Sequence, residues 1–311
     1  MTPVDNSQHF KVFFNEASFT AADGQRIGQA ILQRCELDYS ELRFIFSGTE
    51  IPNPITVTIE NGAGGINNGQ DMTIRTGVSD DFDYVRTVFV DELAEIFMAN
   101  QNNKQWHPRD SKGEALSRVL GGLLYPGGRQ PGFTVHQWVD NDPDGLTPSK
   151  DEKTGPEGLE DWINKTEDSD TRAKSVGCGV AFIHYLHYQL GISFQDIVAQ
   201  SGATLQDVYS GLILAGKVPS SVAAANGFEP FVALVRRKFP KGTPSGLNAL
   251  NKWPNSDQFF PLEIYLDVFV LGQDNMVRTA SRDGAGWHWS TIDGAAFNQG
   301  NPITALRNFG R

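Results

Sequence analysis

The chain is poor in cysteine, in basic residues and in long apolar runs. Two of its 311 residues are cysteine, Cys35 and Cys178, too few for a disulfide framework but enough for one bridge. Lys and Arg number 26 against 37 Asp and Glu, which gives a formal net charge of −11. An acidic chain repels phosphate backbones, so nucleic acid is not expected as a partner. No run reaches the ~18 apolar residues of a membrane-spanning helix, so no membrane span is expected.

A secretory leader is also missing from the first residues, which lack a basic and then apolar stretch. The sequence alone therefore leaves the compartment unknown. Hydrophobic residues make up 39% of the chain and aromatic residues 11%, as in a globular protein. The length allows one large domain and a small one.

The spacing of apolar residues predicts the elements of a domain over residues 1–240. The glycine-rich stretch 61–69 lacks the lysine of a phosphate-binding loop and is predicted to connect two strands. Strands are predicted at 42–46, 55–60 and 72–76, and helices at 20–37, 80–100, 112–124, 174–190, 193–200, 204–214 and 228–239.

After this domain the composition and the periodicity change. Residues 241–256 are rich in Pro, Gly, Asn and Ser, which is typical of a linker. Beyond them apolar residues recur at every second position, beginning with Ile264 and Leu266, and Asp283-Gly284 marks a turn. The predicted fold class is α+β, with a small β-rich unit over 257–311.

Three carboxylates on the predicted helix 80–100 form the first candidate site. Asp91, Glu92 and Glu95 fall within an arc of about 100° that they share with apolar residues. Burying several carboxylates is unfavourable, so raised pKa values, cationic partners or a metal ion should compensate. Arg86 and Arg118 are the candidate cationic partners.

This region resembles the core of the zincin metallopeptidases. In that family a strand, a glycine loop and a second strand precede a helix with the zinc-binding motif His-Glu-x-x-His. Glu114, in the segment Gly-Glu-Ala-Leu-Ser-Arg over 113–118, is similar to the second-helix glutamate of the gluzincins, nearest to the basic secretory protein group. The apolar helix over 177–186 is similar to the downstream helix of that group.

The resemblance covers about residues 20–240 as a pattern. It implies a zincin-like domain, in which a small mixed sheet packs on an active-site helix and a mostly helical lobe follows. It further implies a peptide or protein substrate lying antiparallel to the strand 72–76, and an extracellular location.

The same resemblance implies a role for each acidic residue. Glu92 stands at the position of the general base, and Asp91 and Glu95 stand where the motif has histidines. With Glu114 as third ligand the metal site would consist of oxygen atoms, which suit Ca²⁺, Mg²⁺ or Mn²⁺ better than Zn²⁺. Ordinary zinc peptidase activity is therefore not expected.

Three interpretations of the acidic helix follow: a catalytically inactive zincin without a metal, a metal site with altered chemistry, or a solvated acidic face. The first is favoured over an active enzyme. A function from another class, a non-catalytic module that binds carbohydrate or protein on the zincin scaffold, is the alternative. A structural domain of a larger assembly is the third.

A second acidic motif has the spacing of a calcium loop. Asp140, Asp142 and Asp144 alternate, a glycine follows, and Asp151 takes the twelfth position. Two prolines inside the motif favour a solvated acidic turn over a calcium site.

Histidines supply further candidates. His184 and His187 are one helical turn apart, but their apolar neighbours favour core packing over metal binding. His184, Tyr185 and His136 are candidates for facing the cleft. Cys178, in the same apolar helix, is predicted to be a buried, inert thiol.

The end of the chain contains two tryptophans that could bind sugars. The segment 267–274, followed by Trp287 and Trp289, resembles one repeat of the sugar-binding β-propeller lectins. Carbohydrate binding by this unit is weighed against a purely structural role, because one repeat cannot close a propeller.

Overall fold

The computed structural model describes most of the first 238 residues and three strands beyond them. The described residues are 1–78, 82–102, 106–126, 128, 135, 138–139, 159–168, 172–220, 223–238, 268–271, 277–283 and 286–291. The chain divides into two compact units, Met1–Phe260 and Pro261–Arg311. No helix within the described ranges is both long enough and apolar enough to cross a membrane.

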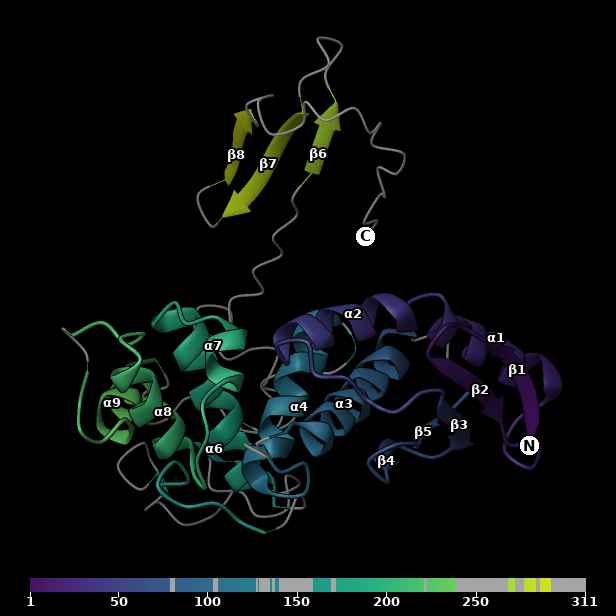
Figure 1. Ribbon diagram of the computed structural model, residues 1–311, viewed down its shortest axis with the longest axis horizontal. Helices are drawn as coiled ribbons and strands as arrows, with labels where there is room; N and C mark the ends of the chain where they lie inside the picture. Colours follow the sequence, from purple (N-terminus) through teal and green to yellow (C-terminus); the bar gives the residue numbers. More distant parts are fainter. Residues whose placement is uncertain are drawn as a thin grey trace. The chain divides into compact units, whose positions relative to one another are not determined.

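The larger unit contains a five-stranded mixed sheet in the order β1-β2-β3-β5-β4 (Figure 1). The three inner strands β2, β3 and β5 are parallel, and β1 and β4 pair antiparallel at the two edges. The bounds are Thr2–Asn6 for β1, Phe10–Phe14 for β2, Ile55–Asn61 for β3, Gly64–Asn67 for β4 and Met72–Thr76 for β5.

Helices make up the rest of the larger unit. In Figure 1 the helices α2, α3 and α4 lie in its middle, with the sheet and α1 towards one end and α6 to α9 towards the other. The bounds are Ala21–Leu32 for α1, Cys35–Ile45 for α2, Phe82–Asn100 for α3, Ser111–Leu124 for α4, Ala173–His184 for α6, Phe194–Val198 for α7, Leu205–Leu214 for α8 and Phe228–Lys238 for α9. A π-helical segment, η2 (Tyr185–Gln189), continues α6.

The central helix α3 is buried on several sides. It contacts the strands β4 and β5 and the helices α1, α2 and α4. Its apolar residues Val85, Leu93, Ile96 and Phe97 are fully buried. Because the helix is enclosed in this way, polar residues along it are buried too, including Asp91 and Glu92 of the acidic motif.

The start of α4 is fixed by a side-chain cap. Asp110 precedes the helix in an extended conformation, and its carboxylate accepts a hydrogen bond from the Gly113 amide at 2.7 Å. This cap determines the register in which α4 presents Glu114 to α3.

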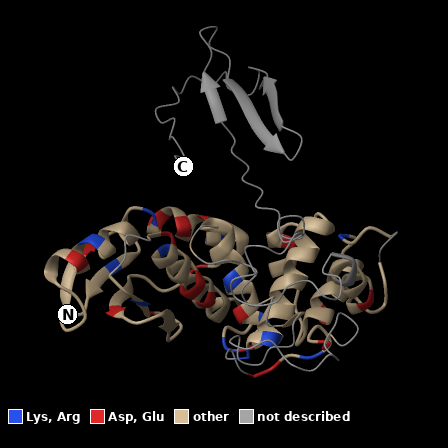
Figure 2. Cartoon of the chain, turned by 180° about the vertical axis from the view of Figure 1, so that it is seen from behind, with Lys and Arg blue, Asp and Glu red and all other residues tan. Residues whose placement is uncertain are grey.

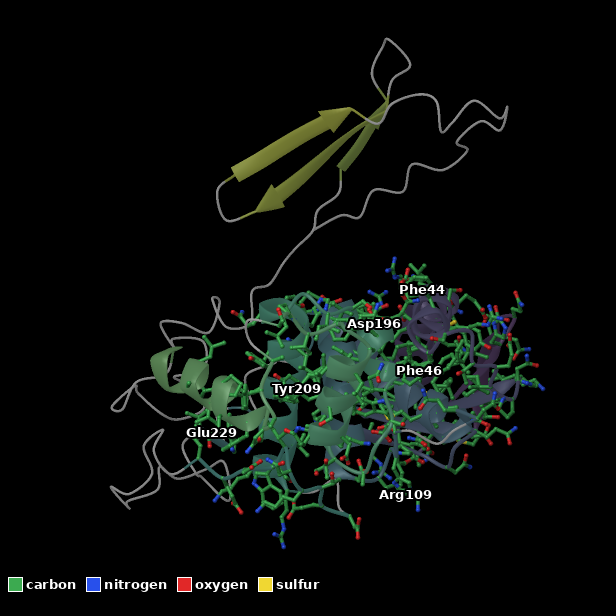
Figure 3. All side chains as sticks on the ribbon, turned by 60° about the vertical axis from the view of Figure 1, so that its left-hand side comes forward. Phe44, Phe46, Arg109, Asp196, Tyr209 and Glu229 are labelled. Atoms are coloured by element: carbon green, nitrogen blue, oxygen red, sulfur yellow. The ribbon has the colours of Figure 1, made fainter. Side chains whose placement is uncertain are left out.

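The structure corrects two predictions near the N-terminus. The single helix expected at 20–37 is two helices, because α1 ends at Leu32 and α2 begins at Cys35. The strand expected at 42–46 is wrong, since these residues include the last turns of α2. Phe44 is 64% exposed whereas Phe46 is buried. Figure 3 labels Phe44 at the margin of the larger unit and Phe46 further inside it. A short apolar run fits a helix and a strand equally well, and here the helix forms.

The glycine-rich stretch 61–69 is more than the plain connection that was expected. It contains β4, the edge strand that pairs with β5. The edge strands β1 and β4 had no counterpart in the predicted elements. The chain as described is a mixed α and β protein with a small mixed sheet, in agreement with the predicted class.

The smaller unit contains the antiparallel strands β6 (Val268–Leu271), β7 (Val277–Asp283) and β8 (Gly286–Thr291), in that order. Trp287 pairs with Arg282, and Trp289 pairs with Ala280. The two tryptophans are two positions apart in β8. Carbohydrate binding there stays a prediction.

Candidate functional site

A cavity of about 680 Å³ lies between the edge strand β4 and the helices α3 and α4. It is lined by all four acidic residues that the zincin resemblance singles out. The lining residues are Gly64, Gly65, Ile66 and Asn67 of β4, Val88, Asp91, Glu92 and Glu95 of α3, Glu114 and Arg118 of α4, and Pro108, Arg109 and Asp168 of the loops.

The α3 carboxylates are not a solvated helix face. Asp91 is 5% exposed and Glu92 is 7% exposed. Gly65 of β4 lies against Glu92 so closely that a Cβ atom on this glycine would stand 2.4 Å from Glu92 Oε1. The strand therefore covers the carboxylate because it has no side chain at this position, and the interpretation as a solvated face is wrong.

Asn67 is a site residue that sequence reasoning missed. Its side-chain amide donates hydrogen bonds to Glu92 Oε2 and to Glu95 Oε2, both at 2.8 Å. A single amide thus bridges two carboxylates on successive turns of α3. No motif marks Asn67 in the sequence, because it lies in a stretch that looks like a loop.

Glu95 and Glu114 bring α3 and α4 together, as the resemblance implies. Burial, the nearby charges of Glu92 and Glu114 and a hydrogen bond with the Glu114 carboxyl group raise the pKa of Glu95 far above its ordinary value; Asn67 opposes this shift. The surroundings of Glu95 therefore favour its protonated form. The hydroxyl of Ser117 also donates to Glu95 Oε1 at 3.3 Å.

One of the two predicted cationic partners joins the site. Arg118 Nε lies 2.6 Å from Glu114 Oε1, one helical turn along α4. Arg86 instead donates to the carbonyl of Ala30 at 3.0 Å and turns away from the acidic residues of the cavity. The cluster is thus partly neutralised by one arginine and by one bound proton.

Asp91 occupies a different part of the cavity wall. A Cβ atom placed on Gly121 of α4 would stand 1.9 Å from Asp91 Oδ1. Gly121 lies seven residues, or about two turns, after Glu114. Asp91 is therefore packed against α4 at some distance along the helix from the Glu95–Glu114 pair.

The arrangement was tested for a divalent cation. Within the described ranges, no group of three or more His, Cys, Asp or Glu side chains is placed to hold a metal ion. The oxygen atoms of Glu92, Glu95 and Glu114 instead accept hydrogen bonds from Asn67, Ser117 and Arg118. As arranged, these carboxyl oxygens are already engaged by hydrogen-bond donors, which a cation would have to displace.

The expected position of the substrate is corrected by the sheet order. β5 (Met72–Thr76) pairs with β3 on one side and with β4 on the other. An extended peptide therefore has no free edge on this strand, and the prediction that a substrate lies along 72–76 is wrong. The exposed edge beside the cavity belongs to β4.

His184 and Tyr185 do not line this cavity. Both are buried, and the Tyr185 ring packs 5.5 Å from that of Phe231. Burial lowers the pKa of His184 to about 3, so this imidazole is neutral. Cys178 is completely buried and, like Cys35, is a free thiol, so no bridge joins the two. His136 and the calcium motif of Asp140, Asp142, Asp144 and Asp151 lie outside the described residues.

Comparisons of the chain with protein-family models, with curated proteins and with solved structures find no match.

Proposed function

We propose that the protein is a zincin-like peptide-binding protein that does not use the zinc chemistry of the peptidases it resembles. The proposal joins the sequence resemblance to two features of the larger unit. One is an antiparallel edge strand beside a long buried helix that carries Glu92. The other is the cavity between them, which is large enough for several side chains.

The observation that carries the proposal is the outer edge of β4 beside the cavity, which pairs with no other strand among the described residues. The Gly64 amide donates to the Tyr84 hydroxyl at 3.0 Å, so it points away from β5. Backbone groups alternate along a strand, and the Ile66 amide therefore faces the same outer edge. An extended peptide can add to such an edge through main-chain hydrogen bonds. The Ile66 side chain, 53% exposed, offers it an apolar contact.

The chemistry of the carboxylates argues for binding without hydrolysis. Zinc peptidases activate water with a cation held by neutral imidazoles. Here the second histidine position is Glu95, a protonated carboxyl group hydrogen-bonded to Glu114. A cation would have to displace that proton and the donors on the neighbouring oxygens, which lowers metal affinity at neutral pH.

Peptide binding is tested on the edge strand. Ile66→Pro removes the outward amide but leaves the hydrogen bonds to β5, since proline is tolerated on an edge strand. Ile66→Val is the matched control because it keeps the amide. With an array of extended peptides followed by titration calorimetry, we expect Ile66→Pro to weaken binding about tenfold or more, and Ile66→Val to bind like the unchanged protein. Failure to bind any peptide, or equal affinity of both variants, would overturn the proposal.

Hydrolysis is tested separately. We expect no cleavage of casein in the absence of metal or with Zn²⁺, Mn²⁺ or Ca²⁺. Cleavage that disappears in Glu92→Gln would establish a metallopeptidase instead.

A further inference from the structure

Two arginines line the cavity, and they are in different states. Arg118 is engaged by Glu114 at 2.6 Å. Arg109 lies on the loop before α4, and its side chain forms no ion pair or hydrogen bond with the described residues. It is exposed, and Figure 3 shows it at the margin of the larger unit. Of these two guanidinium groups, Arg109 is the one available to a ligand.

The backbone that carries Arg109 is held firmly. The Trp106 side chain is buried, and its indole donates to the Val198 carbonyl at 3.2 Å. Asp110 caps α4. Gly113 packs so closely against His107 that a Cβ atom on this glycine would stand 2.0 Å from the His107 carbonyl oxygen. Because the backbone of this turn is held in place, ligand binding loses conformational entropy only from the Arg109 side chain, so the contact is partly preorganised.

Arg109 is a positive charge beside a cavity lined by several carboxyl groups. Among the described lining residues, the ionisable groups other than Arg109 and Arg118 are carboxyl groups, including the exposed Asp168. An anion entering the interior would meet repulsion from Asp91 and Glu92, so Arg109 is the favourable place for it. The planar guanidinium can bind a carboxylate through two parallel hydrogen bonds.

We propose that Arg109 binds a carboxylate of the peptide ligand and thereby fixes the position of the peptide in the cavity. This inference rests on the proposed function and names its ligand class: peptides with a negative group that reaches Arg109. The carboxylate can be the C-terminus or the side chain of Asp or Glu, and the two sources are distinguished by experiment.

The test uses one bound peptide in three forms. The first has a free C-terminal carboxylate, the second is amidated, and the third is amidated but carries Glu in place of a neutral residue. By titration calorimetry on the full chain, we expect the form whose carboxylate reaches Arg109, either the first or the third, to bind about tenfold more tightly than the neutral amide. This difference corresponds to the strength of a charged hydrogen bond at an exposed site. Comparing the first and third forms identifies the source of the carboxylate.

Variants assign the effect to the residue. Arg109→Gln should abolish the preference and bind every form like the neutral amide. Arg43→Gln, which removes the same charge from the helix α2, outside the cavity lining, should keep it. Asp168→Asn should enlarge the preference, because it removes a competing negative charge.

The outcomes separate this inference from the proposed function. If the unchanged protein binds charged and neutral forms equally, or if Arg109→Gln keeps the preference, the role of Arg109 is overturned while peptide binding stands. If no form binds at all, the proposed function fails and the inference fails with it.

Discussion

The side-chain amide of Asn67 on the edge strand donates to the carboxyl group of Glu95 on the central helix, with 2.8 Å between the nitrogen and Oε2. The same amide serves Glu92. This contact connects β4 to the acidic residues of α3. The position of the strand and the protonation of these carboxyl groups therefore depend on each other.

Replacing the bridging amide should destabilise the protein in a pH-dependent manner. Asn67→Asp exchanges two donated hydrogen bonds for a further negative charge, and we expect the free energy of unfolding to fall by about 2–4 kcal/mol at pH 7. The loss should shrink near pH 4, where the added carboxylate is protonated. Urea titrations at both pH values measure this. Asn68→Asp is the control, because Oδ1 of the Asn68 side chain accepts hydrogen bonds from the backbone amides of Gln70 and Asp71, and an aspartate oxygen can accept them too.

Removing the titration of Glu95 should stabilise the protein at neutral pH. The folded-state pKa of Glu95 is raised, so the folded chain holds a proton that the unfolded chain releases above about pH 4.5. The contribution of this group to stability is therefore greatest in acid and falls as the pH rises towards the folded-state pKa. Glu95→Gln, which keeps a donor for Glu114, should raise the free energy of unfolding at pH 7 by at least about 1 kcal/mol.

The pH profile provides the check on this prediction. Stability curves of the unchanged protein should decline between about pH 5 and pH 8 more steeply than those of Glu95→Gln. A parallel pair of curves would show that Glu95 is ionised in the folded protein.

The contact between Asp91 and Gly121 can be measured by a double-mutant cycle. Gly121→Ala places a methyl group where Asp91 Oδ1 now lies, and we expect a loss of about 1–3 kcal/mol from overpacking. Asp91→Ala removes the obstructing atoms, so the double variant should be more stable than the sum of the two single effects. Additive losses would mean that the two residues are not in contact.

The hydrogen bond between Tyr125 and Asp38 should stabilise the protein more at pH 8 than at pH 4. The hydroxyl of Tyr125 lies 2.8 Å from both carboxylate oxygens of Asp38. Burial raises the pKa of Asp38 to about 6, and the tyrosine opposes this shift. Tyr125→Phe should destabilise the protein by about 1–3 kcal/mol at pH 8, where Asp38 is ionised, and by less at pH 4. Thermal melts at the two pH values test this, and an equal loss at both would contradict it.

The sequence predicts two of the central helices to within two residues of their observed ends. The helix predicted at 112–124 is Ser111–Leu124, and the one predicted at 80–100 is Phe82–Asn100. The end of α2 was mistaken for a strand because Leu42 and Ile45 bury one side of a helix within a run too short to show the period. Tertiary packing decides such cases.

The sequence predicts only part of the candidate site, because tertiary packing brings the other residues to it. Spacing along one helix places Asp91, Glu92 and Glu95 near each other, and the resemblance adds Glu114 from the next helix. Asn67 and Arg109 come from segments whose position depends on β4 and on the turn before α4, and no local pattern reveals either. Glycines conceal the edge strand, because they lower β-propensity while permitting the close approach to Glu92.

The helix α4 is tethered at both ends. Near its start, the ammonium group of Lys112 donates to the carbonyl of Gly202, between α7 and α8. At its end, Tyr125 reaches Asp38 on α2. A movement that widened the cavity would have to release one of these buried anchors, so amide hydrogen exchange in α4 should proceed with the global opening of the larger unit and not through local fraying.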